Sequence, residues 1–232
     1  MPAAPLLLLP GLLEDADAFE HQVSGLGGPK AAFVADLTQA DSIAQLARDA
    51  LEQAPAARFA LAGHSMGGYV ALEIMRQAPE RVVRLALLNT HARPDTPAAT
   101  AIRQRLMALA ERDFPAVIAA LLPNLMVEAH LDDPVRTGKV TEMALGTGVA
   151  AFLRQERAII ARIDSRAHLA DIRCQTLVVA GRHDALMPLE ILEELAHGIP
   201  GASLAIVEDC GHLSTLEQPA QVTRLLAAWL AN

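Results

Sequence analysis

Ser65 is the residue of this chain whose surroundings most clearly predict chemistry. It lies at the centre of the segment Gly63-His64-Ser65-Met66-Gly67-Gly68, with a glycine two residues before it and another two residues after it. This spacing suits a serine on a sharp, strained turn, because neighbouring backbone can pack closely only where Cβ atoms are absent. An apolar run precedes the turn and a helical pattern follows it, which places the hydroxyl at a helix N-terminus. The segment therefore predicts a nucleophilic serine.

A glycine-rich turn between a strand and a helix can also bind phosphate. The chain has no G-x-x-x-x-G-K-[ST] segment, and the spacing of Gly63 and Gly67 does not fit G-x-G-x-x-G. These two absences remove the main support for nucleotide binding, so we prefer the nucleophile interpretation.

A serine nucleophile needs a base within hydrogen-bond reach and an acid that orients the base. His212 follows the strand expected at 202–207, and Asp184 follows the strand expected at 175–180. The carboxyl ends of parallel strands share one edge of a sheet, so both side chains can meet Ser65 there. Asp95 and Asp209 also come just after expected strands, and Asp95 is the main alternative acid.

The elbow segment resembles that of the α/β-hydrolase superfamily, specifically its branch of small esterases and lyases. The chain order Ser65, Asp184, His212 is the order expected of that fold. The segment Gly181-x-x-Asp184-x-x-x-Pro188 is similar to the acid loop of the family, and this similarity favours Asp184 over Asp95.

The resemblance also implies an oxyanion hole. Pro10-Gly11 follows the first expected strand, where many relatives have His followed by Gly, and the backbone N–H groups of Leu12 and Met66 would be the two donors. A proline in place of histidine does not remove the Leu12 donor, because a backbone N–H is independent of the preceding side chain.

Apolar runs and helical patterns alternate along most of the chain, which predicts βαβ units and a parallel sheet. Ser42 and Gln45 predict a capping box at the first long helix. With the resemblance, this pattern implies an α/β-hydrolase fold, with a mostly parallel sheet of about six strands and helices on both faces. The expected strands are 5–9, 31–37, 58–62, 82–88, 175–180 and 202–207. Besides the helix that follows Ser65, the expected helices outside the insertion below are 42–53, 189–197 and 218–231.

Residues 92–173 interrupt the alternation with helical patterns only. These patterns lie at 98–111, 115–122, 134–145 and 150–163, and Gly146-Thr147-Gly148 is expected to be a hinge or loop. The resemblance implies a helical cap over the active site. We therefore expect residues 1–91 and 174–232 to form the core and 92–173 the cap, within one structural domain rather than two independent ones.

Substrate specificity is expected to lie in this cap. Its apolar side chains predict a largely apolar pocket, although positions in a helical core carry the same residue types. The candidates for contact with substrate are Phe114, Leu121, Met126, Phe152 and Ile160.

Composition excludes several classes of protein. With 232 residues the chain can bury one substantial core, and a net charge of −8 with only two lysines disfavours nucleic-acid binding. The apolar run Leu6 to Leu9 is too short to cross a bilayer and no basic segment precedes it, so a soluble, cytoplasmic protein without membrane partners is expected. Cys174 and Cys210 are expected as free thiols. No cofactor is expected, and no metal, because no cluster of His, Cys, Asp and Glu has the spacing of a metal site.

The leading functional interpretation is hydrolysis of a carboxylic ester. The substrate is expected to be a small molecule with a small or medium acyl group. Relatives use the same three residues for C–C bond cleavage or elimination, and this alternative stays open. Elimination is the weaker part of this alternative, because the lyases usually carry Arg where this chain has Tyr69. A ligand-binding protein without catalysis is disfavoured by the complete set of Ser65, Asp184 and His212. The sequence encodes neither the identity of the substrate nor the oligomeric state.

Overall fold

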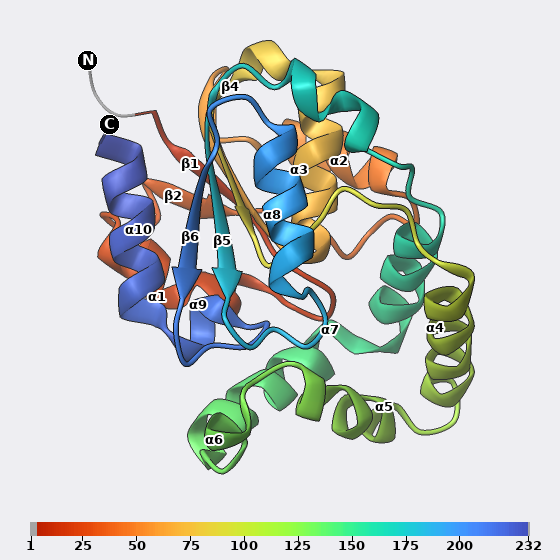
Figure 1. The fold of residues 1–232 in the computed structure, drawn as a ribbon. Coiled ribbons are helices and arrows are strands. Elements are labelled where there is room, and N and C mark those ends of the chain that lie inside the picture. Colours follow the sequence, from red (N-terminus) through yellow and green to blue (C-terminus); the bar gives the residue numbers. More distant parts are fainter. Residues whose placement is uncertain (1–3, 232) are drawn as a thin grey trace.

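A computed structural model of the protein describes residues 4–231. In this range the chain forms a six-stranded sheet in the order β2-β1-β3-β4-β5-β6, and all neighbouring strands are parallel (Figure 1). This architecture confirms the expected fold class. The strands are β1 (Leu6–Leu9), β2 (Ala32–Val34), β3 (Phe59–His64), β4 (Val82–Leu88), β5 (Gln175–Gly181) and β6 (Ser203–Val207).

The inner strands are apolar because both of their faces are covered. Every residue of β1 and of β3 is buried, as the continuous apolar runs predicted. The second strand was expected over 31–37 but spans only Ala32–Val34, because β2 lies at the edge of the sheet and pairs with β1 alone.

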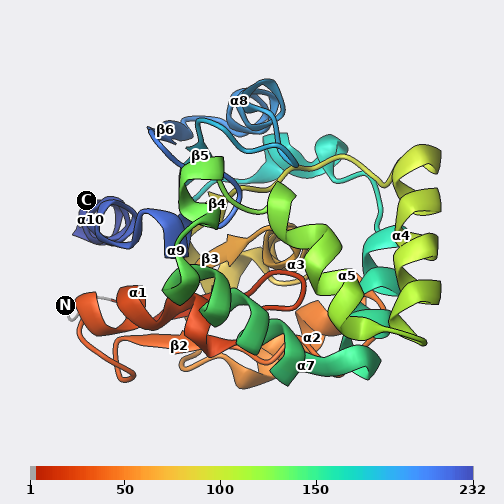
Figure 2. The same ribbon diagram turned by 90° about the horizontal axis from the view of Figure 1, so that it is seen from below.

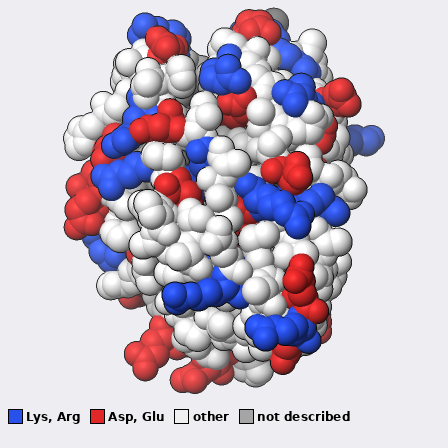
Figure 3. All heavy atoms as spheres, turned by 90° about the vertical axis from the view of Figure 1, so that its right-hand side faces the viewer, with Lys and Arg blue, Asp and Glu red and all other residues white. Residues whose placement is uncertain are grey.

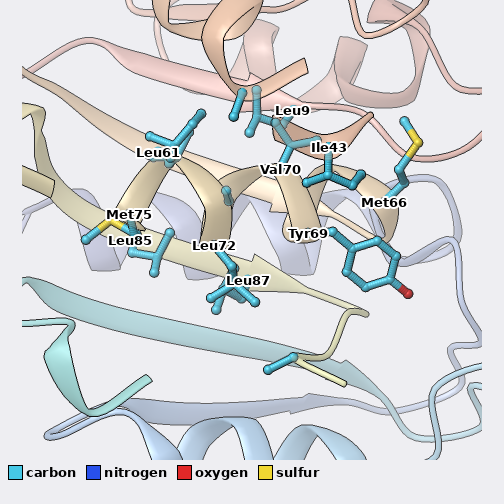
Figure 4. Packing of buried hydrophobic residues seen from close by; sticks show 14 of the residues in the cluster. Leu9, Ile43, Leu61, Met66, Tyr69, Val70, Leu72, Met75, Leu85 and Leu87 are labelled. Carbon is cyan, nitrogen blue, oxygen red and sulfur yellow. The ribbon is translucent and has the colours of Figure 1, made fainter. Parts of the chain in front are cut away.

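Helices cover both faces of the sheet (Figures 1 and 2). On one face, α2, α3 and α8 pack on leucines of the inner strands, and Figure 4 shows this cluster around Leu61, Val70 and Leu87. On the other face α1 and α10 pack together around Phe19 and Trp229. The helices are α1 (Glu20–Gly25), α2 (Ile43–Gln53), α3 (Met66–Gln77), α8 (Leu189–Gly198) and α10 (Pro219–Ala231).

Helix α2 begins as its sequence predicted, but only one half of the capping box forms. Ser42 Oγ accepts a hydrogen bond from the Gln45 N–H at 3.3 Å, which satisfies one free donor of the first turn. The Gln45 side chain does not complete the box, because its Nε2 donates to Asp49 Oδ1 at 2.6 Å, one turn further along the helix. The second half of the predicted capping box was therefore wrong.

Helices α4 to α7 fill the connection between β4 and β5 and lie beyond the arrowheads of the strands (Figure 1). Two helices were expected at 134–145 and 150–163, with a hinge or loop at Gly146-Thr147-Gly148. The segment labelled α7 accordingly consists of two helical stretches that meet at a kink at Gly148, whose φ of 81° and ψ of 166° are not helical. The four helices are α4 (Pro97–Ala110), α5 (Phe114–Leu121), α6 (Glu128–Leu131) and α7 (Pro134–Ile160). The shorter elements of the chain are α9 (Ser214–Glu217), η1 (Ala16–Phe19), η2 (Pro79–Arg81), η3 (Leu122–Asn124) and η4 (Arg166–Asp171).

The register of the strands brings five loops to one edge of the sheet. Leu9 of β1 pairs with Gly63 of β3, and His64 pairs with Leu88 of β4. Gly181 of β5 pairs with Val207 of β6 at the same level. The loops that follow these strands therefore begin side by side, at the edge over which the inserted helices lie.

Charged side chains of both signs are interspersed over the face shown in Figure 3. This mixture fits a protein of net charge −8 that has two lysines. None of the helices within residues 4–231 has both the length and the apolar character needed to cross a bilayer.

Candidate active site

Ser65 stands between β3 and α3 in a strained conformation, with φ of 51° and ψ of −116°. The two flanking glycines make this turn sterically possible. A Cβ atom on Gly63 would lie 2.3 Å from the carbonyl oxygen of Gly67, and one on Gly67 would lie 2.1 Å from that of Leu9. The turn thus packs backbone against backbone and presses the start of α3 onto the end of β1.

Three residues that are far apart in the sequence meet at this edge of the sheet. Ser65 Oγ lies 2.8 Å from His212 Nε2, and His212 Nδ1 lies 2.9 Å from Asp184 Oδ2. The side chains of His212 and Asp184 are buried. This is the geometry in which a histidine can take a proton from a serine hydroxyl while a carboxylate fixes its tautomer.

Asp184 is held as an ionised carboxylate. Its Oδ1 accepts the N–H groups of Leu186 and Met187, both at 2.9 Å, and its Oδ2 accepts Asn89 Nδ2 at 2.9 Å as well as His212. Burial raises the pKa of Asp184, but the charge and hydrogen bond of His212 and the hydrogen bonds from Asn89 and Met187 outweigh burial, so the pKa is lowered.

The alternative acids lie elsewhere. Asp95 Oδ1 binds Arg162 at 3.0 Å and Arg103 at 3.4 Å, and its Oδ2 accepts the Thr100 hydroxyl at 2.7 Å. Asp209 has an exposed side chain and a φ of 49°. Of these carboxylates, the structure brings Asp184 to His212.

The loop after β1 lies beside the elbow because Gly67 contacts Leu9. Leu13 in this loop has a φ of 62°, and its N–H donates to Gln155 Oε1 of α7 at 3.1 Å. Within the described residues 4–231, the N–H groups of Leu12 and Met66 donate to no loop or side-chain acceptor.

A family model described as the alpha/beta hydrolase family matches residues 6–225, nearly the whole chain. The protein belongs to this family. The strand order, the serine on its strained turn and the helices between β4 and β5 agree with that membership.

Several hydrolases resemble this α/β hydrolase. It is 33% identical to a pimeloyl-[acyl-carrier protein] methyl ester esterase of Aromatoleum aromaticum, over 71% of this chain and 70% of the relative. It is 30% identical to a putative carbamate hydrolase RutD of Azorhizobium caulinodans, over 80% of this chain and 72% of the relative. The solved structure of a thermophilic esterase from Thermogutta terrifontis superposes with a TM-score of 0.90 at 28% identity, over 98% of this chain and 89% of that one. The α/β hydrolase is thus an enzyme with esterases among its relatives.

The five cap residues expected at the substrate lie in different environments. Phe114 and Phe152 pack with ring centroids 5.8 Å apart, in a buried cluster that also contains Leu13 of the loop after β1. Leu121 is partly buried against the same cluster. Met126 is buried with Leu213, the residue after His212, whereas Ile160 is half-buried at the end of α7. Phe114, Phe152 and Met126 therefore adjoin the two loops of the site.

His91 follows β4 and is held neutral. Its Nδ1 accepts the Arg93 N–H at 3.0 Å and therefore carries no proton, and its Nε2 lies 3.2 Å from Tyr69 Oη. Burial lowers the pKa of His91 to about 4, and the nearby charges of Arg162, Arg93 and Arg103 add to this effect. The Arg162 guanidinium also stacks 4.5 Å from the centroid of the Tyr69 ring.

Sequence reasoning missed two polar residues that hold the site. Asn89 has a φ of 48°, and its amide donates to Asp184 and to the Gly211 carbonyl oxygen, while its Oδ1 accepts the Ser214 hydroxyl at 2.6 Å. Glu14 lies buried behind the loop after β1, where it contacts His64. The available signals were an asparagine at a strand end, since asparagine tolerates positive φ, and a carboxylate beside an apolar loop.

Proposed function

We propose that this α/β hydrolase cleaves carboxylic esters of small or medium, largely apolar acyl groups through an acyl-enzyme on Ser65. The observation that carries the proposal is the unbroken hydrogen-bond chain from Ser65 Oγ through His212 to Asp184. The esterases among the relatives support the same chemistry.

In the first half of the reaction, His212 Nε2 takes the proton of Ser65 as the serine oxygen attacks the ester carbonyl. The N–H groups of Leu12 and Met66 bind the oxyanion, and such donors typically lower a barrier by about 3 kcal/mol each. The tetrahedral intermediate collapses, the C–O bond breaks, and the alcohol leaves with the proton from His212.

In the second half, water attacks the acyl-enzyme and gives its proton to His212. A second oxyanion forms at the same two N–H groups and collapses to release the carboxylic acid, and the proton returns to Ser65. Asp184 stays ionised throughout and stabilises the imidazolium that forms twice in each turnover. We take residues 92–173 to be the cap. The acyl group would lie against the apolar side chains of this cap that are named above.

The test is turnover of p-nitrophenyl esters of graded acyl length by the wild type, by Ser65→Ala and by Ser24→Ala, which alters an exposed serine on α1. We expect a chain-length optimum in kcat/KM for the wild type and Ser24→Ala, and a loss of about 10⁴-fold or more in Ser65→Ala. Ester turnover retained in Ser65→Ala would overturn the proposal. Covalent labelling of Ser65 by a fluorophosphonate without turnover of any ester would favour C–C cleavage or elimination by the same residues.

A further inference from the structure

A second acid–histidine pair lies directly behind the nucleophile. His64, the residue before Ser65, is fully buried, and Glu14 is 4% exposed. His64 Nδ1 lies 2.8 Å from Glu14 Oε1 and 3.0 Å from Oε2. The hydrolytic mechanism proposed above makes no use of either residue.

The hydrogen-bond partners determine the charge of this histidine. His64 Nε2 lies 2.8 Å from the carbonyl oxygen of His212, which can only accept, so Nε2 carries a proton. Nδ1 faces a carboxylate that also accepts the Gly11 N–H at 2.6 Å. Acceptors therefore stand at both ends of the ring, and both are satisfied when each nitrogen carries a proton.

We propose that His64 is a permanent imidazolium and that its ion pair with Glu14 positions the catalytic loops. This inference rests on the proposed function, because the loops that the pair connects are those of the proposed nucleophile, base and oxyanion donor.

Positioning follows from the connections of the pair. Glu14 holds Gly11, which precedes the oxyanion donor Leu12 by one residue. His64 belongs to the elbow and holds the backbone of His212. One buried ion pair thus connects the loop of the oxyanion hole, the nucleophile and the base.

The charges around His64 favour the imidazolium. The ring centroids of His64 and His212 are 5.2 Å apart. Glu14 and Asp184 are the carboxylates that face the two rings. Burial lowers the pKa of His64, but the charge and hydrogen bond of Glu14, the His212 carbonyl and the charge of Asp184 outweigh burial, so the pKa is raised.

The charge of His64 is measured directly by NMR on protein labelled with ¹⁵N in histidine. At pH 8 we expect one histidine of the wild type to keep both ring nitrogens protonated, and this signal to disappear in Glu14→Gln. A neutral tautomer for every histidine of the wild type at pH 8 would overturn the proposal. This measurement needs no turnover, so it decides the charge of His64 even if the proposed ester hydrolysis fails.

Glu14→Gln removes the charge with little change in shape. The Gln oxygen can accept the Gly11 N–H, and its amide nitrogen can donate to Nδ1 of a neutral His64, so the connections survive. Glu14→Ala removes these connections as well. We expect fluorophosphonate labelling of Ser65 to be about tenfold slower in Glu14→Ala, because a hydrogen bond to a charged group is lost, and to recover in Glu14→Gln. Labelling of Glu14→Ala at the rate of the wild type would overturn the proposal.

Glu73→Gln is the matched control. Glu73 is a carboxylate of α3 that is 5% exposed and binds Arg76 and Gln77 rather than a histidine. We expect Ser65 of this variant to be labelled at the rate of the wild type. A wild type that is not labelled at Ser65 would count against the proposed function, and the NMR result would still stand.

Discussion

Asn89 Nδ2 donates a hydrogen bond of 2.9 Å to Asp184 Oδ2, the same oxygen that binds His212. Asn89 comes from the end of β4 and Asp184 from the end of β5, which are neighbouring strands of the sheet. The amide therefore fixes the carboxylate from the side opposite the Leu186 and Met187 N–H groups, which bind Oδ1. Asp184 is held by four donors, of which His212 is one.

Replacing Asn89 with glycine tests this contact without straining the backbone. Glycine adopts the φ of 48° freely, so the loop should keep its path. A hydrogen bond to a charged group contributes about 1.5 to 3 kcal/mol. If the variant loses part of this stabilisation in the transition state, kcat falls roughly tenfold. Steady-state kinetics on an active ester should show this fall in kcat with KM nearly unchanged. A kcat within twofold of the wild type would show that the amide is dispensable.

The identity of the acid can be tested by comparing two aspartates. Asp184→Asn should lower kcat by about 10³- to 10⁴-fold, because an amide does not hold His212 in the productive tautomer. Asp95→Asn should stay within about tenfold of the wild type, because Asp95 binds Arg103 and Arg162 rather than His212. Kinetics on both variants, with circular dichroism to verify folding, distinguishes them. Equal losses of kcat in the two variants would contradict the assignment of Asp184.

His91 should make the protein less stable as the pH falls. Its pKa is about 4 in the folded protein and about 6.5 in the unfolded chain, so between these values the unfolded chain binds a proton that the folded protein does not. The contribution of His91 to the free energy of unfolding therefore decreases by at most about 3 kcal/mol as the pH falls from about 6.5 to about 4, and this contribution is constant below about pH 4.

His91→Gln isolates this contribution, since the Gln oxygen can still accept the Arg93 N–H and does not titrate. Urea unfolding of both proteins at pH 7.5, 6.0 and 4.5 should give free energies that decline more steeply for the wild type. Asp184 and Asp95 titrate alike in both proteins and cancel in the comparison. Parallel pH dependences would show that His91 has the same pKa in the folded protein as in the unfolded chain.

Two glycines of α7 offer a matched pair, because a Cβ atom at either position would meet no atom within 4 Å. Gly146 has helical dihedral angles, so Gly146→Ala should stabilise the protein by about 0.5 to 1 kcal/mol. Gly148 has a φ of 81° and a ψ of 166°, so Gly148→Ala should destabilise it by about 1 to 3 kcal/mol. Thermal unfolding should show Tm shifts of opposite sign, and shifts of the same sign would contradict the break at Gly148.

The sequence predicted those features that are encoded locally. Glycines around Ser65, apolar runs for strands and a histidine just after the last strand each follow from a few neighbouring residues, and the structure has the elbow, the six strands and the position of His212 accordingly. The two helical stretches of α7 were also expected, because the glycines of Gly146-Thr147-Gly148 favour a break, and the helix is interrupted at Gly148.

The missed contacts join residues that are distant in the sequence. Glu14 meets His64 across 50 positions, Asn89 meets Asp184 across 95, and Leu13 meets Gln155 across 142. Each is a polar side chain whose partner is determined by the order and register of the strands, which periodicity does not report. The boundaries of the cap and its contacts with substrate stay predictions for the same reason.

The backbone of the cap also takes part in holding the base. The Leu125 carbonyl oxygen accepts the N–H groups of both His212 and Leu213 at 3.1 Å, and Glu217 joins the Val127 N–H to the Gly211 N–H, each at 2.9 Å. Opening of the inserted helices as one rigid lid would break these bonds and release the base from the nucleophile. A displacement of α4 and α5 that leaves residues 125–127 in place would preserve these bonds. A chimera that exchanges the insertion to change substrate specificity should keep residues 125–127 and replace the residues that precede them.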